Sequence, residues 1–262
     1  MEKYLDANKA MWNQRTEIHV DSEFYDVPSF IAGRSSLNAI ELDILGNLKG
    51  KKLLHLQCHF GQDTLSFARM GAHATGIDIS DKAIEKARTL NEKLSLDAQF
   101  VCCNVLDIDQ HLSDTYDVIF TSYGTIGWIP QLTKWAQLIH QFLKPGGQFL
   151  IVEFHPVVWM LNNEMTYFQY SYFNKEMIVE TEGTYTDGDE GFEAKSYSWN
   201  HPLADVFTAL LEAGLTVNHF SEYDYSPYDC FEKTLAVEKG FQIKGLEGLM
   251  PMVYALGAVK LI

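Results

Sequence analysis

The feature that most constrains the fold is a regular alternation of short apolar runs and amphipathic stretches between residues 52 and 154. The apolar runs have the length of strands, and the stretches between them carry apolar residues at helical spacing. Strands that alternate with helices form βαβ units, whose strands lie parallel in one sheet with helices on both faces. The pattern therefore predicts strands at 52–58, 73–79, 98–105, 116–123 and 148–154, and helices at 62–70, 81–93 and 131–143.

Two further helices are predicted before this pattern. Residues 4–15 form the first, and a loop separates it from the second. Apolar residues from Leu37 to Leu48 lie at helical spacing in the second helix. Ser35 or Ser36 can cap its start and Gly50 can end it.

Residues 156–201 interrupt the alternation. They are rich in aromatic residues, and two strand-like runs flank the turn-forming residues 187–191, which predicts an antiparallel hairpin. This aromatic segment is interpreted either as a lid over a pocket or as an ordinary apolar layer or dimer contact.

The chain then returns to a helix at 203–213 and two strands at 215–225 and 250–261. The link between these strands, 226–249, shows no long helix. Because parallel neighbours need a long crossover, usually helical, we expect an antiparallel end to the sheet.

Composition limits the classes of partner. The 262 residues are 47% hydrophobic and 21% charged, as in a globular domain. The net charge of −15 disfavours nucleic acid and anionic membranes, which attract basic surfaces. No run approaches 18 apolar residues, and the N-terminus lacks the features of a signal peptide. We expect a cytoplasmic protein that acts on a small molecule, and oligomeric state is not predicted.

The cysteines and histidines give no sign of a metal site. None of the four cysteines forms a C-x-x-C pair or has zinc-site spacing with histidine. Free thiols in a reducing compartment are therefore expected. The four cysteines are Cys58, Cys102, Cys103 and Cys230.

A ligand site is expected where the first two strands end, because open parallel sheets bind ligands beyond the carboxyl ends of their strands. Gly61 follows the first strand and permits a tight turn into a helix, whose first N–H groups are free. Asp78 ends the second strand and can accept hydrogen bonds from a ribose diol. A nicotinamide-dependent oxidoreductase shares these features, usually with a fuller G-x-G-x-x-G.

The sequence LLHLQCHFGQDTLSFARMGAHATGIDIS resembles the first two signature blocks of class I S-adenosylmethionine-dependent methyltransferases. The usual first block of that family is D/E-x-G-x-G-x-G. Here His55 stands at the acidic position, Gln57 and His59 replace the first two glycines, and Gly61 matches. A subset of methyltransferase-like proteins is similar in this same HLQCHFGQDT segment.

Later segments extend the resemblance to 37–155 and 203–262. Cys103-Asn-Val resembles the stretch that holds adenine, and YDVIFTSYG and LKPGGQFLIVEF resemble the blocks of the fourth and fifth strands. The resemblance implies a doubly wound α/β fold, Rossmann-like, with a mostly parallel seven-stranded sheet, a reversed last strand and an antiparallel insertion. The implied domains are a helical cover at 1–36, a cofactor domain at 37–155 and 202–262, and an insertion or lid at 156–201.

The implied cofactor is S-adenosylmethionine, and the matches imply where it would lie. The N-terminal segment is expected to cover it, with Tyr25 or Arg34 nearby. The implied cofactor-binding residues are Gln57, Cys58, His59 and Gly61 at the methionine part, Asp78 and Ile79 at the ribose and adenine, Asn104 and Val105 at the adenine edge, and Thr121 and Ser122 beneath the sulfonium.

A hydroxyl acceptor would need a general base, whereas an ionised thiol or carboxylate would not. The candidate catalytic residues are His155, Glu153 and Tyr123, with His201 as a further one. By strand alternation, Glu153 and His155 point to one side of the fifth strand. Alternatively, His155 only ends that strand before Pro156.

The sequence thus predicts a methyltransferase enzyme with a small-molecule acceptor. A nicotinamide-dependent oxidoreductase and a non-catalytic, cofactor-binding regulatory protein remain as alternatives.

Overall fold

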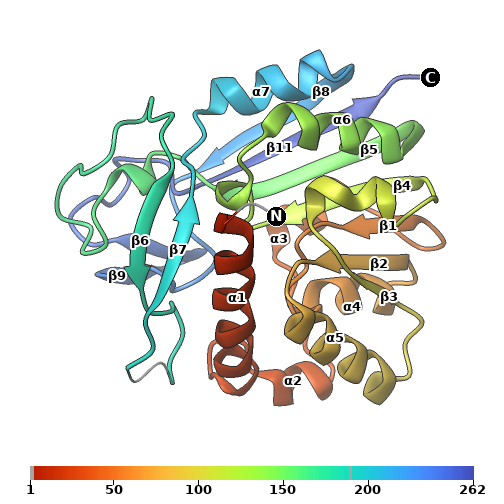
Figure 1. Ribbon diagram of the computed structural model, residues 1–262, viewed down its shortest axis with the longest axis horizontal. Helices are drawn as coiled ribbons and strands as arrows, with labels where there is room; N and C mark the ends of the chain where they lie inside the picture. Colours follow the sequence, from red (N-terminus) through yellow and green to blue (C-terminus); the bar gives the residue numbers. More distant parts are fainter. Residues whose placement is uncertain (1–2, 189–190) are drawn as a thin grey trace.

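A computed structural model describes residues 3–188 and 191–262 of the chain. Its centre is a seven-stranded sheet with the order β3-β2-β1-β4-β5-β11-β8 (Figure 1). The strands of this sheet are β1 (Lys52–His55), β2 (His73–Asp78), β3 (Gln99–Cys102), β4 (Tyr116–Ser122), β5 (Leu143–Phe154), β8 (Leu215–Tyr223) and β11 (Val253–Lys260).

The pairing of these strands confirms the predicted topology. β1 pairs in parallel with β2 and with β4, and β4 pairs in parallel with β5. β11 runs antiparallel to both β5 and β8, so it is the reversed strand. The order of the strands turns at β1 and β4, and doubly wound sheets bind ligands in the crevice at such a point.

Helices cover both faces of the sheet (Figure 1). One apolar layer includes Phe67 and Phe120, whose ring centroids lie 5.2 Å apart, and the other includes Trp135 and Phe149 at 5.5 Å. The helices that complete these layers are α3 (Ala39–Leu45), α4 (Gln62–Arg69), α5 (Asp81–Leu94), α6 (Leu132–Phe142) and α7 (Leu203–Glu212).

The N-terminal region differs from the sequence prediction. The helix α1 (Lys3–Asp21) is longer than predicted, and a short helix α2 (Val27–Ile31) lies in the predicted loop, with Asp26 accepting from the backbone N–H of Ser29. α3 begins after Asn38, whose backbone N–H donates to the carboxylate of Glu41 at 2.6 Å. It ends at Gly46 (φ 63°), so the predictions of a serine cap and of Gly50 as the end were wrong.

The aromatic segment contains the predicted antiparallel hairpin, formed by β6 (Ile178–Glu182) and β7 (Ala194–Ser198). Residues 189–190 of the predicted turn lie outside the described residues. The hairpin stands beside α1 (Figure 1), and Asn8 of α1 exchanges two hydrogen bonds with the backbone of Tyr197 at 2.7 and 2.9 Å. The insertion and the N-terminal helix are therefore joined.

Short elements complete the described chain. The link between β8 and β11 forms a second hairpin, which the sequence did not reveal, from β9 (Thr234–Val237) and β10 (Gly240–Ile243). The 3₁₀ turns are η1 (Val105–Gln110), η2 (Ile126–Trp128) and η3 (Val158–Met160). Among the described residues, no helix has the length and apolarity needed to cross a membrane. The cytoplasmic location stays a prediction.

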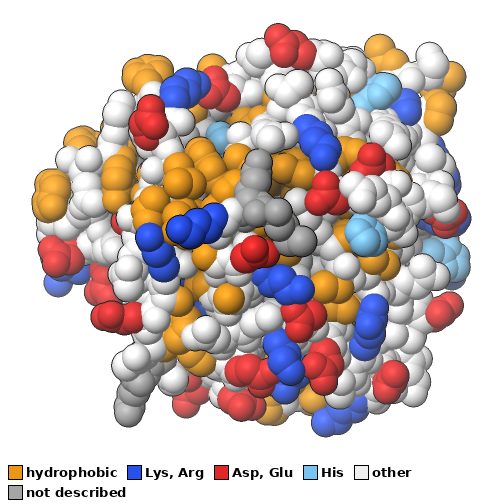
Figure 2. Space-filling view, viewed as in Figure 1, with side chains coloured by type: hydrophobic (Ala, Val, Ile, Leu, Met, Phe, Trp, Pro, Cys, Tyr) orange, Lys and Arg blue, Asp and Glu red, His pale blue; other side chains and the backbone are white. Residues whose placement is uncertain are grey.

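The surface of the insertion carries exposed apolar side chains. Phe168 is 66% and Phe173 is 75% exposed, and Met177 and Val179 are also exposed. Figure 2 shows apolar side chains gathered over the part of the molecule where β6 and β7 lie. The segment thus has one side on α1 and another in solvent.

Candidate functional site

A cavity of about 850 Å³ lies where β1, β2 and β4 end. Its wall combines the turns after these strands with residues of α1, the aromatic segment and the stretch 228–232. Binding sites for small molecules have volumes of this order and occur at this edge of doubly wound sheets. The cavity is therefore the candidate site.

The turn after β1 has an unusual backbone. Gln57 (φ 54°), His59 (φ 51°) and Gly61 (φ 83°) all adopt the left-handed region, which is uncommon for residues other than glycine. At Gly61 a side chain is also excluded, because its Cβ would lie 2.7 Å from the ring of Phe100. Glycine is thus required for space at 61, whereas at 57 and 59 the surrounding contacts hold the conformation.

Asp78 fixes this turn. One oxygen of its carboxylate accepts from the backbone N–H of His59 at 2.8 Å, and the other accepts from that of Ser80 at 2.8 Å. Burial raises the pKa of Asp78 to about 6, and these N–H donors oppose the rise. The carboxylate lines the cavity and retains lone pairs for hydroxyl donors.

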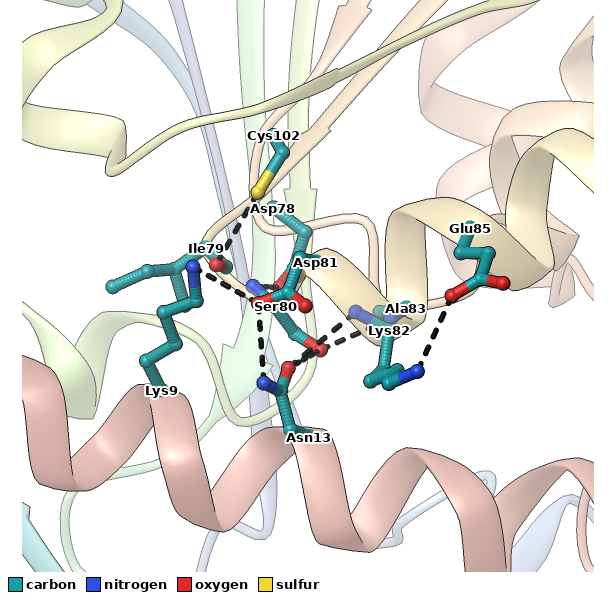
Figure 3. Close-up of polar contacts among 10 residues, drawn as sticks. All are labelled: Lys9, Asn13, Asp78, Ile79, Ser80, Asp81, Lys82, Ala83, Glu85 and Cys102. Carbon is teal, nitrogen blue, oxygen red and sulfur yellow. Dashed lines mark hydrogen bonds and ion pairs between the residues drawn. The ribbon is translucent and has the colours of Figure 1, made fainter.

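Polar contacts join α1 to Ser80 and Asp81, which follow Asp78 in the sequence (Figure 3). The hydroxyl of Ser80 donates to the Asn13 side chain at 2.7 Å. Asp81 forms an ion pair with Lys9 at 2.9 Å and accepts from the amide of Asn13 at 3.1 Å. The N-terminal helix is therefore held against the edge of the site.

Two neutral imidazoles connect the turn, α1 and the insertion. The backbone N–H of Phe60 donates to His59 Nδ1 at 2.7 Å, so Nε2 of His59 carries the hydrogen and donates to His19 Nδ1 at 2.9 Å. His19 Nε2 then donates to Thr184 Oγ1 at 2.6 Å. Burial lowers the pKa of His59 to about 3 and that of His19 to about 2, which keeps both rings uncharged.

One wall atom supports the presence of a ligand. Gln57 Oε1 is buried and has no hydrogen-bond partner among the described residues, while its Nε2 donates to the carbonyl of Thr125 at 2.9 Å. A buried acceptor without a donor is costly, and a ligand N–H or O–H would satisfy it. Together with Asp78 and Gly61, this acceptor fits the hydroxyls and the amino group of S-adenosylmethionine.

The structure brings most of the predicted cofactor residues to the cavity wall. Thr121 is the exception, because its hydroxyl is buried and donates to that of Thr125 at 3.0 Å. Tyr25 and Arg34 of the N-terminal segment also lie at the wall. The predicted residues at the wall are Gln57, Cys58, His59, Gly61, Asp78, Ile79, Asn104, Val105 and Ser122.

The candidate bases have different surroundings. Tyr123 lines the cavity with a left-handed backbone (φ 38°), and burial raises its pKa. Glu153 also lines the cavity, but backbone N–H groups surround its carboxylate. The structure does not bring His155 to the wall; it lies 3.0 Å from Glu222. His201 is also absent from the wall and bonds to the carbonyl of Ile129 at 2.8 Å.

Sequence reasoning missed two carboxyl groups beside Tyr123. Glu41 is fully buried and accepts from the Tyr123 hydroxyl at 3.1 Å. Burial, with the nearby charge of Asp63, raises the pKa of Glu41 to about 7. Asp63 lies at the cavity wall, where burial raises its pKa to about 6. The sequence offered a signal for each: Glu41 is an acid on the predicted apolar face of α3, and Asp63 is an acid close to the Gly61 turn.

Glu41→Gln is expected to raise the free energy of unfolding by about 2–3 kcal/mol at pH 8 and by little at pH 5. The folded-state pKa of about 7 exceeds the ordinary 4.5, so the cost of the raised pKa to stability builds up as the pH rises from 4.5 and is complete above pH 7. This cost disappears as the pH falls below 4.5, because both states then bind the proton. The amide retains an oxygen for the N–H of Asn38.

Urea unfolding at the two pH values measures this difference. Asp43→Asn, on the exposed side of the same helix, is the control and should change stability little at either pH. An equal gain for Glu41→Gln at both pH values would contradict the prediction.

Comparison with known proteins agrees with this geometry. A family model described as a methyltransferase domain matches residues 47–197, more than half of the chain. An uncharacterized methyltransferase of Synechocystis is 30% identical over 138 residues, which are 50% of this chain and 60% of that protein. A ubiquinone biosynthesis O-methyltransferase of Aeromonas salmonicida is 26% identical over 136 residues, 50% and 57% of the two chains. The chain therefore matches less than two thirds of the length of these relatives.

A solved structure shows the same fold over nearly the whole chain. An S-adenosylmethionine-dependent methyltransferase from Clostridium acetobutylicum aligns with a TM-score of 0.61 and 14% identity, covering 96% of this chain and 99% of that one. At this identity the likeness concerns the fold alone. From the family match and this architecture, the chain belongs to the methyltransferase-domain family.

Proposed function

We propose that this chain is an S-adenosylmethionine-dependent methyltransferase that acts on a small-molecule acceptor. The observation that carries the proposal is that Gly61 and Asp78 both line one cavity at the edge of the sheet where β1 and β2 end. Gly61 lets a ligand approach the backbone, and Asp78 offers a carboxylate to the ribose hydroxyls. The family match supports the same activity.

When bound, the cofactor supplies a methyl group on a sulfonium, which an aligned nucleophile displaces. In this proposal the protein binds, orients and shields the reactants. Aromatic side chains of the insertion reach the cavity, including Trp159, Tyr170 and Tyr185. They exclude water from the reacting atoms, and their aromatic faces favour a methyl acceptor that is uncharged or cationic over one that is anionic.

The covered position of the site supports a small acceptor. Segments 1–36 and 156–201 act in this proposal as a joint cover, because α1 is bonded both to β7 and to the start of α5. His19 and Thr184 tie the same two segments to the turn after β1. The cavity of about 850 Å³ beneath this cover has room for a metabolite beside the cofactor.

Thermal shift with S-adenosylhomocysteine and with NAD tests the cofactor class. A ligand that binds only the folded state raises the midpoint of unfolding with its concentration. We expect stabilisation by S-adenosylhomocysteine and none by NAD. Stabilisation by NAD alone would contradict the proposal. If S-adenosylhomocysteine stabilises the protein, transfer of a labelled methyl group to members of a metabolite library would identify the acceptor.

A further inference from the structure

β1 ends in a histidine, His55, and not in a negatively charged residue. His55 stands where related signature blocks carry an acid, and its Nδ1 lies 2.9 Å from the hydroxyl of Thr64. Burial lowers the pKa of His55 to about 3, so the ring is neutral at physiological pH. His55 therefore offers no charge to a cationic group in the cavity.

A carboxylate does reach the same cavity from the other side of the turn. Asp63 is the second residue of α4, two positions after Gly61, and lies at the cavity wall. Ser36 donates its hydroxyl to one oxygen at 2.6 Å, and Ser122 donates to the other at 3.4 Å. Two segments distant in sequence thus orient this carboxylate.

Asp63 has no cationic partner among the residues that the structure describes. None of the ion pairs of these residues includes it. Arg34 lines the same cavity, but its guanidinium donates to the carbonyl of Tyr25 at 2.7 Å and lies 3.8 Å from Asp26. Carboxylates removed from water are usually paired with a cation.

The surroundings of Asp63 increase the negative charge rather than neutralise it. Burial, and after it the negative charge of Asp63, raises the pKa of Glu41, whose carboxylate accepts from the hydroxyl of Tyr123. The nearby Tyr228 hydroxyl accepts from the amide of Asn38 at 2.8 Å, and both of these groups are uncharged. A ligand cation at Asp63 would offset the charge of both carboxyl groups.

We infer that Asp63 binds the α-ammonium group of the methionine part of S-adenosylmethionine, and so supplies the negative charge that His55 lacks. The turn from Gln57 to Gly61 is where the methionine part is expected, and Asp63 lies two residues beyond it. The buried oxygen of Gln57, which has no donor among the described residues, is a second acceptor on this wall. This inference rests on the proposed cofactor.

A structural role is the alternative for Asp63. A carboxylate in the first turn of a helix interacts favourably with the helix dipole, whatever the ligand. The two roles predict different selectivity. If Asp63 contacts the ammonium, its replacement weakens only ligands that carry the amino group, whereas a structural role weakens all ligands equally.

Isothermal titration calorimetry with three ligands separates these outcomes. The ligands are S-adenosylhomocysteine, its analogue without the α-amino group, and 5′-methylthioadenosine, which lacks the whole amino-acid part. For the natural protein, we expect removal of the amino group to weaken binding at least 20-fold. For Asp63→Asn, we expect S-adenosylhomocysteine to bind at least 20-fold more weakly and the two other ligands to bind within threefold of the natural protein.

Asp205→Asn is the matched control, because Asp205 lies in the first turn of α7 and outside the cavity wall. It should leave all three affinities within threefold. Equal weakening of all three ligands by Asp63→Asn would overturn the inference. So would equal affinity of the natural protein for S-adenosylhomocysteine and for its analogue without the amino group. The second comparison needs no variant. Failure of all three ligands to bind the natural protein would instead reject the proposed function.

Discussion

Asp78→Ala is expected to weaken the binding of S-adenosylhomocysteine at least 100-fold, and that of 5′-methylthioadenosine by a similar factor. A carboxylate that accepts from two ribose hydroxyls makes charge-assisted hydrogen bonds, each contributing about 1.5–3 kcal/mol. Both ligands carry the ribose, so both should lose these bonds. Calorimetric titration of the folded variant measures the two affinities.

Part of this loss comes from the turn itself. Without the carboxylate, the backbone N–H groups of His59 and Ser80 lose their acceptor, and the left-handed backbone at His59 is no longer held. Asp78→Asn provides the matched control, because it keeps one acceptor oxygen at nearly the same volume. It should fall between the natural protein and the alanine variant.

A loss below tenfold for both ligands, with the fold intact, would contradict the role of Asp78 at the ribose. A selective loss of S-adenosylhomocysteine would place Asp78 at the amino-acid part instead. Because Asp63→Asn is expected to show that selective pattern, the two variants test different parts of the same ligand.

The fold was largely predictable because its order is set by local patterns. Five apolar runs alternate with helices between residues 52 and 154, and this pattern has few compatible topologies. The antiparallel end followed from the missing crossover helix between 226 and 249. The hairpin β9–β10 was not predicted, because the two residues of its turn, Glu238 and Lys239, are not those that usually mark a hairpin in a sequence.

Two boundaries near the N-terminus were predicted wrongly, one because of a local cap and the other because of tertiary contacts. Asn38 rather than a serine starts α3, and the partner that favours this start is Glu41, which the fold buries. α1 extends to Asp21 because His19 packs against the turn after β1 and hydrogen-bonds Thr184. The contacts of His19 have no signal in a local sequence pattern, whereas Asn38-Ala-Ile-Glu41 is a local capping-box pattern that the sequence prediction overlooked.

The site was predictable in outline, since Gly61 and Asp78 follow from the ends of adjacent strands. The partners of these residues come from distant segments and were not. His19 lies 40 positions from the imidazole that it contacts, and Glu41 lies 82 positions from the Tyr123 hydroxyl. Alternation along β5 placed Glu153 and His155 together, but the strand ends at Phe154 and the chain turns.

Glu153→Ala is expected to lower the free energy of unfolding by at least about 3 kcal/mol, which would make Glu153 a structural residue. Its carboxylate accepts from the backbone N–H groups of Gly124, Thr125, Ile126 and Phe154, and from the hydroxyl of Thr125. Leaving a buried donor without an acceptor costs about 1–3 kcal/mol for each group. Water that enters from the cavity recovers part of this cost.

Glu153→Gln distinguishes this role from general base catalysis. A glutamine keeps one acceptor oxygen but turns an N–H group towards backbone donors, so it should also destabilise the fold, by about 2 kcal/mol. Burial raises the pKa of Glu153, and the four backbone donors oppose that rise by favouring the ionised form. A base whose lone pairs are occupied in this way has little capacity left for a proton from the acceptor.

Glu222→Ala is the control for the loss of a carboxylate near the end of β5. Its side chain is 47% exposed and lies 3.0 Å from His155 Nε2, and exposed pairs of this kind contribute at most about 1 kcal/mol. Urea unfolding of the three variants gives the comparison. If Glu153→Gln kept full stability while methyl transfer fell by orders of magnitude, the structural assignment would be wrong and Glu153 would return as the base. The expected order has alanine at 153 the least stable and alanine at 222 close to the natural protein. It leaves Tyr123 as the remaining candidate at the cavity wall, where burial raises its pKa and its hydroxyl donates to Glu41.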